Sequence, residues 1–237
     1  MDAAALNQKK GMSGSTLKLI AIITMFIDHF GAVLLENSSH QVLYFTCRFI
    51  GRIAFPIFCF LLVEGFGKTR CLWKYELRLF LFAFLSEIPF DLAIFGTIWY
   101  PKYQNVFFTM AIGLLTITAM ERIAKRQQNR RTAQVLLVVI AAAGCVLAAL
   151  LKTDYGAFGV LVIVIMYLTF ADRKTMTWAA GAAFLIGELI PTVLLAFIPI
   201  HFYNGERGLR IKYFFYIFYP AHLLVLYMLS RAMGLIA

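Results

Sequence analysis

Ionisable side chains interrupt several long apolar stretches of this sequence, and they are the first candidates for chemistry. Asp28 and His29 are neighbours in the first stretch, and Arg48 and Arg52 lie four residues apart in the second. His222 lies in the last stretch. A histidine titrates near neutral pH and commonly acts as a general base, and an arginine in a dry site can stabilise an oxyanion. These five residues are the predicted catalytic residues.

Two acidic residues of the third stretch repeat the spacing of the arginines with the opposite charge. Glu87 and Asp91 are four residues apart, so both side chains leave one helix face. Two interpretations stay open: the acids pair with Arg48 and Arg52 as interhelical salt bridges, or they bind a substrate. We expect Asp28 to hold an arginine, or a histidine of another helix, because adjacent helical residues point about 100° apart.

Most of these groups share a depth within their helices. At about 1.5 Å per residue, they lie about 8–15 Å below the predicted outer helix ends. A charge in the bilayer costs at least about 2.5–3.5 kcal/mol, so each group needs a partner or a task. The common depth predicts one wet cavity that opens outward, although hydrogen-bonded packing is the other interpretation for the histidines. Its predicted members are His29, Arg48, Arg52, Glu87, Asp91, Glu188 and His222.

The composition and the apolar runs predict helices that are long enough to cross a membrane and to hold these ionisable groups within it. The chain has 237 residues, of which 62% are hydrophobic and 14% charged, whereas soluble domains have about 25% charged residues. Continuous apolar runs of about 20 residues are typical of transmembrane helices, and they lack the alternation of barrel strands. We predict an all-α, polytopic transmembrane bundle over 17–237 after a cytoplasmic tail over 1–16. The eight predicted helices are 17–35, 42–66, 75–96, 104–121, 133–151, 156–171, 177–198 and 213–233.

The distribution of lysine and arginine predicts the orientation. With the N-terminus inside, the predicted inner segments carry 15 of the 22 basic residues, which places both termini in the cytoplasm. Topology therefore explains the net charge of +10 better than nucleic-acid binding does. The exception is a basic loop that is predicted to lie outside. Its residues Asn204, Glu206 and Arg207 are expected to cover or select a substrate there.

Motifs for metal, nucleotide or disulfide chemistry are missing from the sequence. The four cysteines form no CxxC and no Cys/His spacing, so no metal site and no disulfide framework is predicted. No Walker loop, GxGxxG or HExxH motif occurs either. This argues against nucleotide hydrolysis, dinucleotide binding and zincin proteolysis.

Seven segments, in order, resemble the TraX family of bacterial membrane proteins, which is named for a conjugation-system pilin acetylase. They are residues 17–31 (LKLIAIITMFIDHFG), 48–56 (RFIGRIAFP), 62–66 (LVEGF), 86–91 (SEIPFD), 105–109 (NVFFT), 203–208 (YNGERG) and 218–222 (FYPAH). The resemblance runs from about residue 17 to 222 and thins between about 123 and 200. The family is similar in outline to larger transmembrane acyltransferases that use cytosolic acetyl-CoA.

The resemblance implies an acetyltransferase in the bacterial cytoplasmic membrane. It would move an acetyl group from acetyl-CoA to an amine or hydroxyl on the outer side, on a pilin N-terminus, a glycan or a lipid. The donor's phosphates would bind a basic inner rim, either the loop over 122–131 or Lys68, Arg70, Lys74 and Arg78. The alternative is a transporter or flippase that uses the same charges to bind a substrate or protons.

Overall fold

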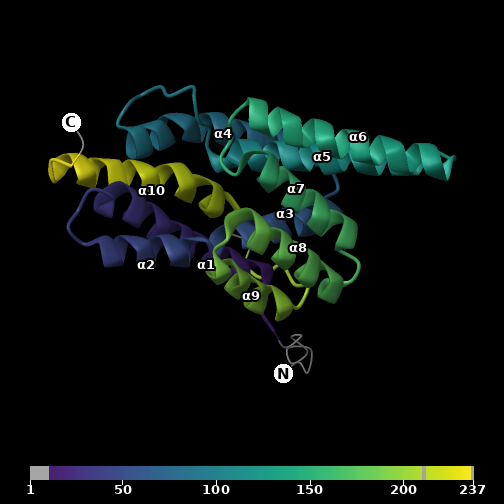
Figure 1. Ribbon diagram of the computed structural model, residues 1–237, viewed down its shortest axis with the longest axis horizontal. Helices are drawn as coiled ribbons and strands as arrows, with labels where there is room; N and C mark the ends of the chain where they lie inside the picture. Colours follow the sequence, from purple (N-terminus) through teal and green to yellow (C-terminus); the bar gives the residue numbers. More distant parts are fainter. Residues whose placement is uncertain (1–10, 210–211, 236–237) are drawn as a thin grey trace, which may run out of the picture.

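Helices make up most of the computed structural model, which describes residues 11–209 and 212–235 (Figure 1). The elements are α1 (Gly14–Phe30) with its π-helical extension η2 (Gly31–Leu35), α2 (Gln41–Gly51), α3 (Ala54–Lys68), α4 (Leu72–Phe95), α5 (Val106–Arg126), α6 (Arg130–Leu150), α7 (Gly156–Thr169), α8 (Arg173–Glu188), the 3-10 helix η3 (Pro191–Ala196), α9 (Phe197–His201) and α10 (Lys212–Ala232). The described residues form no β-strand, which confirms the all-α prediction. Residues 1–10 of the predicted tail lie outside the described part.

Five stretches of the described chain are long and apolar enough to cross a membrane. They are Gly14–Leu35, Gln41–Lys68, Val106–Arg126, Arg130–Leu150 and Tyr213–Ala232. Two apolar stretches are shorter, namely Gly156–Thr169 and Pro191–His201. A helical membrane protein is thereby confirmed, with five candidate spans, whereas the count of eight stays a prediction.

The predicted helix over 177–198 is wrong, because the chain breaks in its middle. α8 ends at Glu188, and Leu189 adopts a left-handed conformation with φ 54°. Pro191 then begins η3; proline lacks an N–H and disfavours a helical residue before it. Arg173, at the start of α8, donates to the Tyr203 carbonyl over 2.6 Å. The segment of η3 and α9 therefore runs back along α8.

This return pass moves the basic loop over 202–209 to the end of the bundle where α1 begins, called here the N-terminal end. The Met12 N–H donates to the Phe202 carbonyl over 2.8 Å, and the Gly14 N–H donates to the Glu206 carbonyl over 2.8 Å. The prediction that the N-terminus and this loop lie on opposite sides is wrong. A return pass of 11 residues was too short to recognise as a separate element.

α10 runs in the same direction as α1. The Lys18 ammonium lies 5.4 Å from the Phe215 ring centroid, and further along both helices His29 contacts His222. The last turn of α10 therefore lies at the far end of the bundle, opposite the N-terminal end (Figure 1). The described chain thus begins and finishes at opposite ends, against the prediction that both termini lie on one side.

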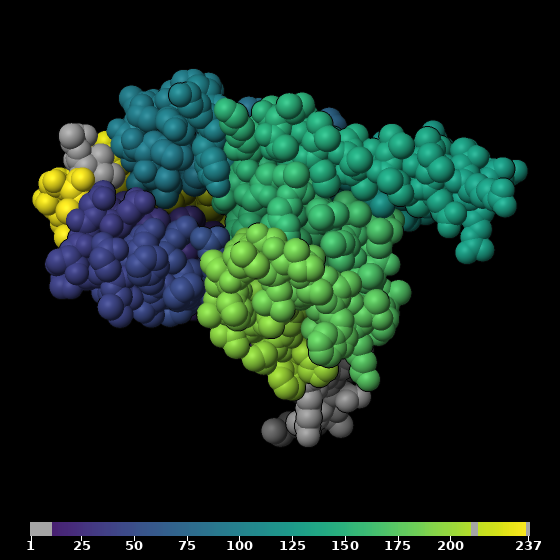
Figure 2. Space-filling view, in the orientation of Figure 1, coloured from purple at the N-terminus to yellow at the C-terminus, as the bar shows by residue number. Residues whose placement is uncertain are grey.

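The core forms around α3, whose apolar side chains face several neighbouring helices. Ile57, Phe60 and Leu62 are each at most 1% exposed. α5 and α6 form a hairpin, and the segment that joins them projects beyond the body of the molecule (Figure 2). The predicted catalytic residues lie on α1, on α2 and just after it, and on α10, away from this projecting segment.

Candidate functional site

The two intramembrane histidines contact each other directly. Nδ1 of His29 lies 2.7 Å from Nε2 of His222, and Nδ1 of His222 lies 2.7 Å from the Phe218 carbonyl oxygen. A carbonyl only accepts, so Nδ1 of His222 donates to it. In the neutral pair, Nε2 of His222 then accepts from Nδ1 of His29. This leaves a lone pair on Nε2 of His29, which has no hydrogen-bond partner among the described residues.

Beside this pair, Asp28 binds an arginine, as predicted. Its Oδ2 atom lies 2.7 Å from Nη1 of Arg48. Gly51 makes the approach possible, because a Cβ atom there would lie only 2.1 Å from Oδ1 of Asp28. Sequence reasoning missed Gly51, and its place between Arg48 and Arg52 was the available signal. The contact joins the end of α1 to the end of α2.

Arg52 pairs with a carboxylate on α8 rather than on α4. Its Nη1 atom lies 3.4 Å from Oε2 of Glu188. The first interpretation of the acidic pair, in which Glu87 and Asp91 neutralise the two arginines, is therefore wrong. The arginine spacing correctly placed both side chains on one face, but their partners come from α1 and α8.

The acids of α4 instead hold the segment that joins α4 to α5. Oε2 of Glu87 accepts from the Asn105 N–H over 3.2 Å, and Oδ2 of Asp91 accepts from the Tyr100 N–H over 2.7 Å. Asn105 in turn caps α5, because its side chain accepts from the Phe107 N–H. Both acids are thus engaged in local structure.

A cavity of about 440 Å³ enters the bundle from the N-terminal end. We call it the basic cavity, since Lys18, Lys68, Arg78 and Arg207 line it and Glu64 is the one acid among its lining residues. Lys68 and Arg78 thus lie where donor phosphates were expected, whereas Arg70 and Lys74 are exposed outside it. Arg207 also lines this cavity, so it lies at the same end of the bundle as Lys68, whereas the two were predicted on opposite sides.

The mouth of the basic cavity is tied to the loop over 202–209. Nζ of Lys68 lies 2.5 Å from Oε1 of Glu64, and the Tyr203 hydroxyl donates to the same oxygen over 2.7 Å. Lys68 also donates to the Gly205 carbonyl. Asn204 accepts from the Glu206 N–H over 2.9 Å and so shapes the loop itself. Asn204 and Glu206 lie at the N-terminal end, where Tyr203 and Arg207 are the loop residues that line the cavity.

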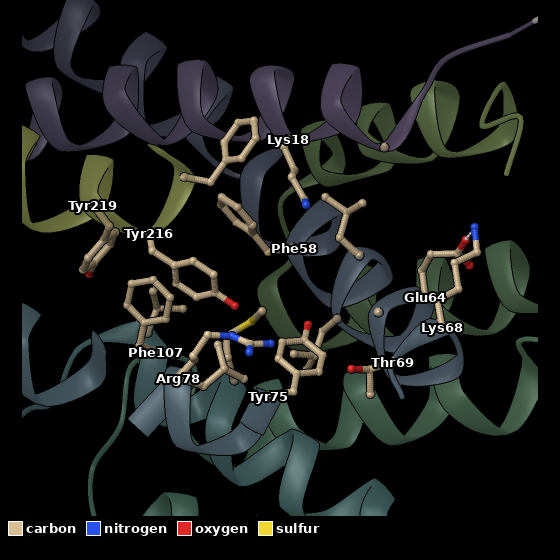
Figure 3. A pocket seen from close by; sticks show the side chains of 18 of the residues that line it. Lys18, Phe58, Glu64, Lys68, Thr69, Tyr75, Arg78, Phe107, Tyr216 and Tyr219 are labelled. Atoms are coloured by element: carbon tan, nitrogen blue, oxygen red, sulfur yellow. Dashed lines mark ion pairs between the residues drawn. The ribbon is translucent and has the colours of Figure 1, made fainter. Parts of the chain in front are cut away.

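The deep end of the basic cavity reaches the histidine pair through Tyr219. This residue is 2% exposed, and its hydroxyl has no hydrogen-bond partner among the described residues. Its ring centroid lies 5.8 Å from that of His29 and 5.7 Å from that of His222. Figure 3 shows Tyr219 at one end of the cavity and the Glu64–Lys68 ion pair at the other. Sequence reasoning missed Lys18 and Tyr219 as lining residues.

A second cavity of about 370 Å³ lies beyond the charged residues. We call it the acidic cavity; its lining residues are Arg52, Tyr103, Asp154, Tyr155, Phe158, Gly187, Glu188 and Ile190. The Tyr103 hydroxyl donates to Oδ1 of Asp154 over 2.8 Å. Burial raises the pKa of Asp154, although this hydrogen bond and the charge of Arg52 act to lower it.

The two cavities follow each other along the bundle. On α1, Gly14, Lys18 and Met25 line the basic cavity, and the next turn carries Asp28 and His29. On the paired helices α2 and α3, Arg52 lines the acidic cavity, and the basic cavity begins at Phe58. The ion pairs and the histidine pair therefore lie where the lining passes from one cavity to the other.

These features define a class of protein: an α-helical membrane protein with a histidine pair and half-buried ion pairs between two cavities. The chain belongs to the TraX family, because the family model described as TraX protein matches residues 13–230. It is also 30% identical over 241 residues to the probable fimbrial assembly protein FimC, serogroup H1, of Dichelobacter nodosus, with 90% of this chain and 94% of that protein covered. The resemblance found in the sequence is thus confirmed. No solved structure matches the chain.

Proposed function

We propose that this protein is an acetyltransferase in the bacterial cytoplasmic membrane, which moves an acetyl group from cytosolic acetyl-CoA to an amine or hydroxyl on the other side. The observation that carries the proposal is the position of His29. Its Nε2 has a free lone pair beside the deep end of a cavity whose mouth is basic. Membership of the TraX family and the fimbrial relative support an acceptor at the cell surface, such as a pilin, a glycan or a lipid.

The shape and charge of the basic cavity suit acetyl-CoA as the donor. Its mouth carries Lys68 and Arg207, which would bind phosphates, and its interior carries apolar side chains such as Phe58 and Met110. From Gly14 to Met25 the cavity follows about 17 Å of α1, at 1.5 Å per residue. An elongated arm therefore fits, with its thioester beside Tyr219.

The chemistry proceeds as base-assisted acyl transfer. Nε2 of His29 takes the proton from the acceptor amine or hydroxyl as that atom attacks the thioester carbonyl. The carbon–sulfur bond then breaks, and the leaving CoA thiolate receives the proton from His29. The unpartnered hydroxyl of Tyr219 donates to the carbonyl oxygen as its negative charge develops. Arg48 and Arg52 are further candidates to stabilise this oxyanion. They would use the guanidinium N–H groups that do not bind Asp28 or Glu188.

The orientation belongs to the proposal as well. We place the N-terminal end in the cytoplasm, because Lys68 and Arg173 lie there together with Arg207. Short basic segments stay on the cytoplasmic side of a membrane. The basic cavity then opens to cytosolic acetyl-CoA, and the acidic cavity lies toward the outer side.

Donor binding tests the basic cavity. Lys18→Gln and Arg78→Gln are each expected to raise the Kd for acetyl-CoA by about tenfold or more. A hydrogen bond to a charged group is worth about 1.5–3 kcal/mol, and about 1.4 kcal/mol is a factor of ten. Calorimetric titration of the detergent-solubilised protein measures the change. Lys74→Gln is the matched control, because Lys74 is exposed outside the cavity. An unchanged Kd in both cavity variants would exclude this cavity as the donor site.

In this proposal His222 is a positioning residue, because its Nε2 accepts from Nδ1 of His29 and so fixes the tautomer of His29. This role has its own test. In His222→Gln, the amide oxygen still accepts from Nδ1 of His29, and most activity is expected to remain. His222→Phe removes the acceptor, so the tautomer of His29 is no longer fixed, and the rate is expected to fall by about 100-fold or more. The pH profile of the rate should move in the Phe variant alone. Equal losses and unchanged profiles in both variants would indicate a purely structural role.

Transport is the second candidate, and the two cavities at successive depths favour it. The same protein in vesicles distinguishes the candidates, because an acetyltransferase passes label from labelled acetyl-CoA to isolated envelope fractions. A transporter would instead accumulate a labelled substrate in the vesicles without transfer. Label found in an envelope component supports the acetyltransferase.

A further inference from the structure

The acidic cavity has no task in donor binding, and its lining carries polar groups suited to another ligand. We propose that it is the acceptor site and that the acceptor reaches it sideways from the bilayer. The acceptor's amine or hydroxyl head would enter the cavity while its apolar anchor lies against α8 and η3. The assignment of this cavity to the acceptor rests on the proposed function, whereas its opening toward the lipid does not depend on that function.

The polar lining favours a head group that donates hydrogen bonds. Asp154 and Glu188 supply carboxylates against the single guanidinium of Arg52, so one negative charge is in excess. The ion pair of Arg52 with Glu188 is long, at 3.4 Å, and Nε of Arg52 is buried without a hydrogen-bond partner. These groups therefore retain capacity to bind a ligand, and an ammonium or hydroxyl matches the carboxylate oxygens.

The cavity is also placed for attack on the donor. Arg52 leaves the same helix face as Arg48, whose partner Asp28 adjoins His29 on α1. The basic cavity approaches this point from the N-terminal end, and the acidic cavity approaches it from the far side. A nucleophile in the acidic cavity therefore meets the thioester without sharing the donor's path.

The rim of the acidic cavity indicates an opening toward lipid. Ile186 is 78% exposed and Leu189 is 80% exposed, and both flank Glu188 at the end of α8. α7 and α8 have 14 and 16 residues, so they span about 21 and 24 Å. A hydrocarbon layer of about 30 Å is thicker than either helix. With Arg173 at one membrane surface, the end of α8 would lie below the opposite surface, where its exposed apolar side chains would contact acyl chains.

A single engineered thiol tests both parts of the proposal. Ile190→Cys is introduced with Cys71 and Cys145 replaced by serine, because these two native thiols are not buried. Vesicles are treated with a dodecyl maleimide, which partitions into the bilayer, or with an impermeant sulfonated maleimide. Lys152→Cys in the same background is the control in an exposed loop. We expect the dodecyl reagent to label Ile190→Cys at least tenfold faster than the sulfonated one does, and the sulfonated reagent to label Lys152→Cys readily.

Activity after labelling then tests the assignment to the acceptor. Labelled Ile190→Cys is expected to lose at least nine-tenths of its acetyl transfer to envelope fractions while its Kd for acetyl-CoA stays unchanged. Faster labelling by the sulfonated reagent would overturn the lateral opening, and full transfer after labelling would overturn the acceptor site. Failure of the unmodified protein to bind acetyl-CoA would instead refute the proposed function, and the labelling rates would still decide whether the cavity opens to lipid.

Discussion

His29→Ala lowers the rate of acetyl transfer by about 10²–10⁴ in the purified protein while the helical fold persists; this is the result we expect. The variant removes the one nitrogen of the histidine pair that has a free lone pair. General bases contribute about 10²–10⁴ in rate, so a loss of this size is expected at saturating acetyl-CoA. Labelled acetyl transfer to envelope fractions measures it, and circular dichroism confirms that the helices remain.

The chain offers a matched control for this variant. His201 is exposed at the end of α9, at the N-terminal end and away from the pair. His201→Ala is therefore expected to transfer acetyl groups at the rate of the unmodified protein. An active His29→Ala protein would remove the proposed base and shift the role to another group. Loss of donor binding in His29→Ala would point to cavity collapse instead of lost chemistry.

Gly51→Ala is expected to destabilise the protein strongly. The new methyl group would overlap the carboxylate of Asp28, because a Cβ at this position lies 2.1 Å from Oδ1. Overpacking alone costs about 1–3 kcal/mol. Separation of the Asp28–Arg48 pair would add to this cost, since it leaves two half-buried charges without partners. Thermal unfolding in detergent, followed by circular dichroism, measures the fall in Tm.

Gly67→Ala provides the comparison, since this glycine also lies in a helix and a Cβ there meets no atom within 4 Å. Alanine favours helix over glycine by about 1 kcal/mol, so the Tm of Gly67→Ala should stay equal or rise. Equal Tm values for the two variants would show that the close approach of Asp28 to Gly51 does not contribute to stability.

Much of the fold could be predicted because it depends on local patterns. The predicted helices 133–151 and 213–233 nearly coincide with Arg130–Leu150 and Lys212–Ala232. The turn of the chain at Leu189 could not be predicted in the same way. Its left-handed backbone and the short return pass have no hydropathy signal of their own, although Pro191 marked the position. Because the return pass of η3 and α9 was not predicted, the loop over 202–209 was predicted at the wrong end of the bundle and α10 was predicted to run in the opposite direction.

The candidate site was predictable in its charged residues and not in their partners. Residue type and position in the apolar stretches identified Asp28, His29, Arg48, Arg52 and His222, and the structure brings each of them to a half-buried polar contact. Which helix faces an arginine depends on tertiary packing, which sequence patterns do not show. The partner of Arg52 is therefore Glu188 and not Glu87 or Asp91. Tyr219 was not predicted, because its burial beside the histidines follows from the packing of α10.

The projecting hairpin of α5 and α6 has a practical consequence for imaging the protein. A membrane protein of 26.9 kDa offers few features for aligning particle images by electron microscopy. α6 contributes no side chain to either cavity, and the segment at 127–129 joins two helices outside the main body. Both helices can be continued into a soluble helical fusion partner at this point, which provides an alignment mark while both cavities stay open.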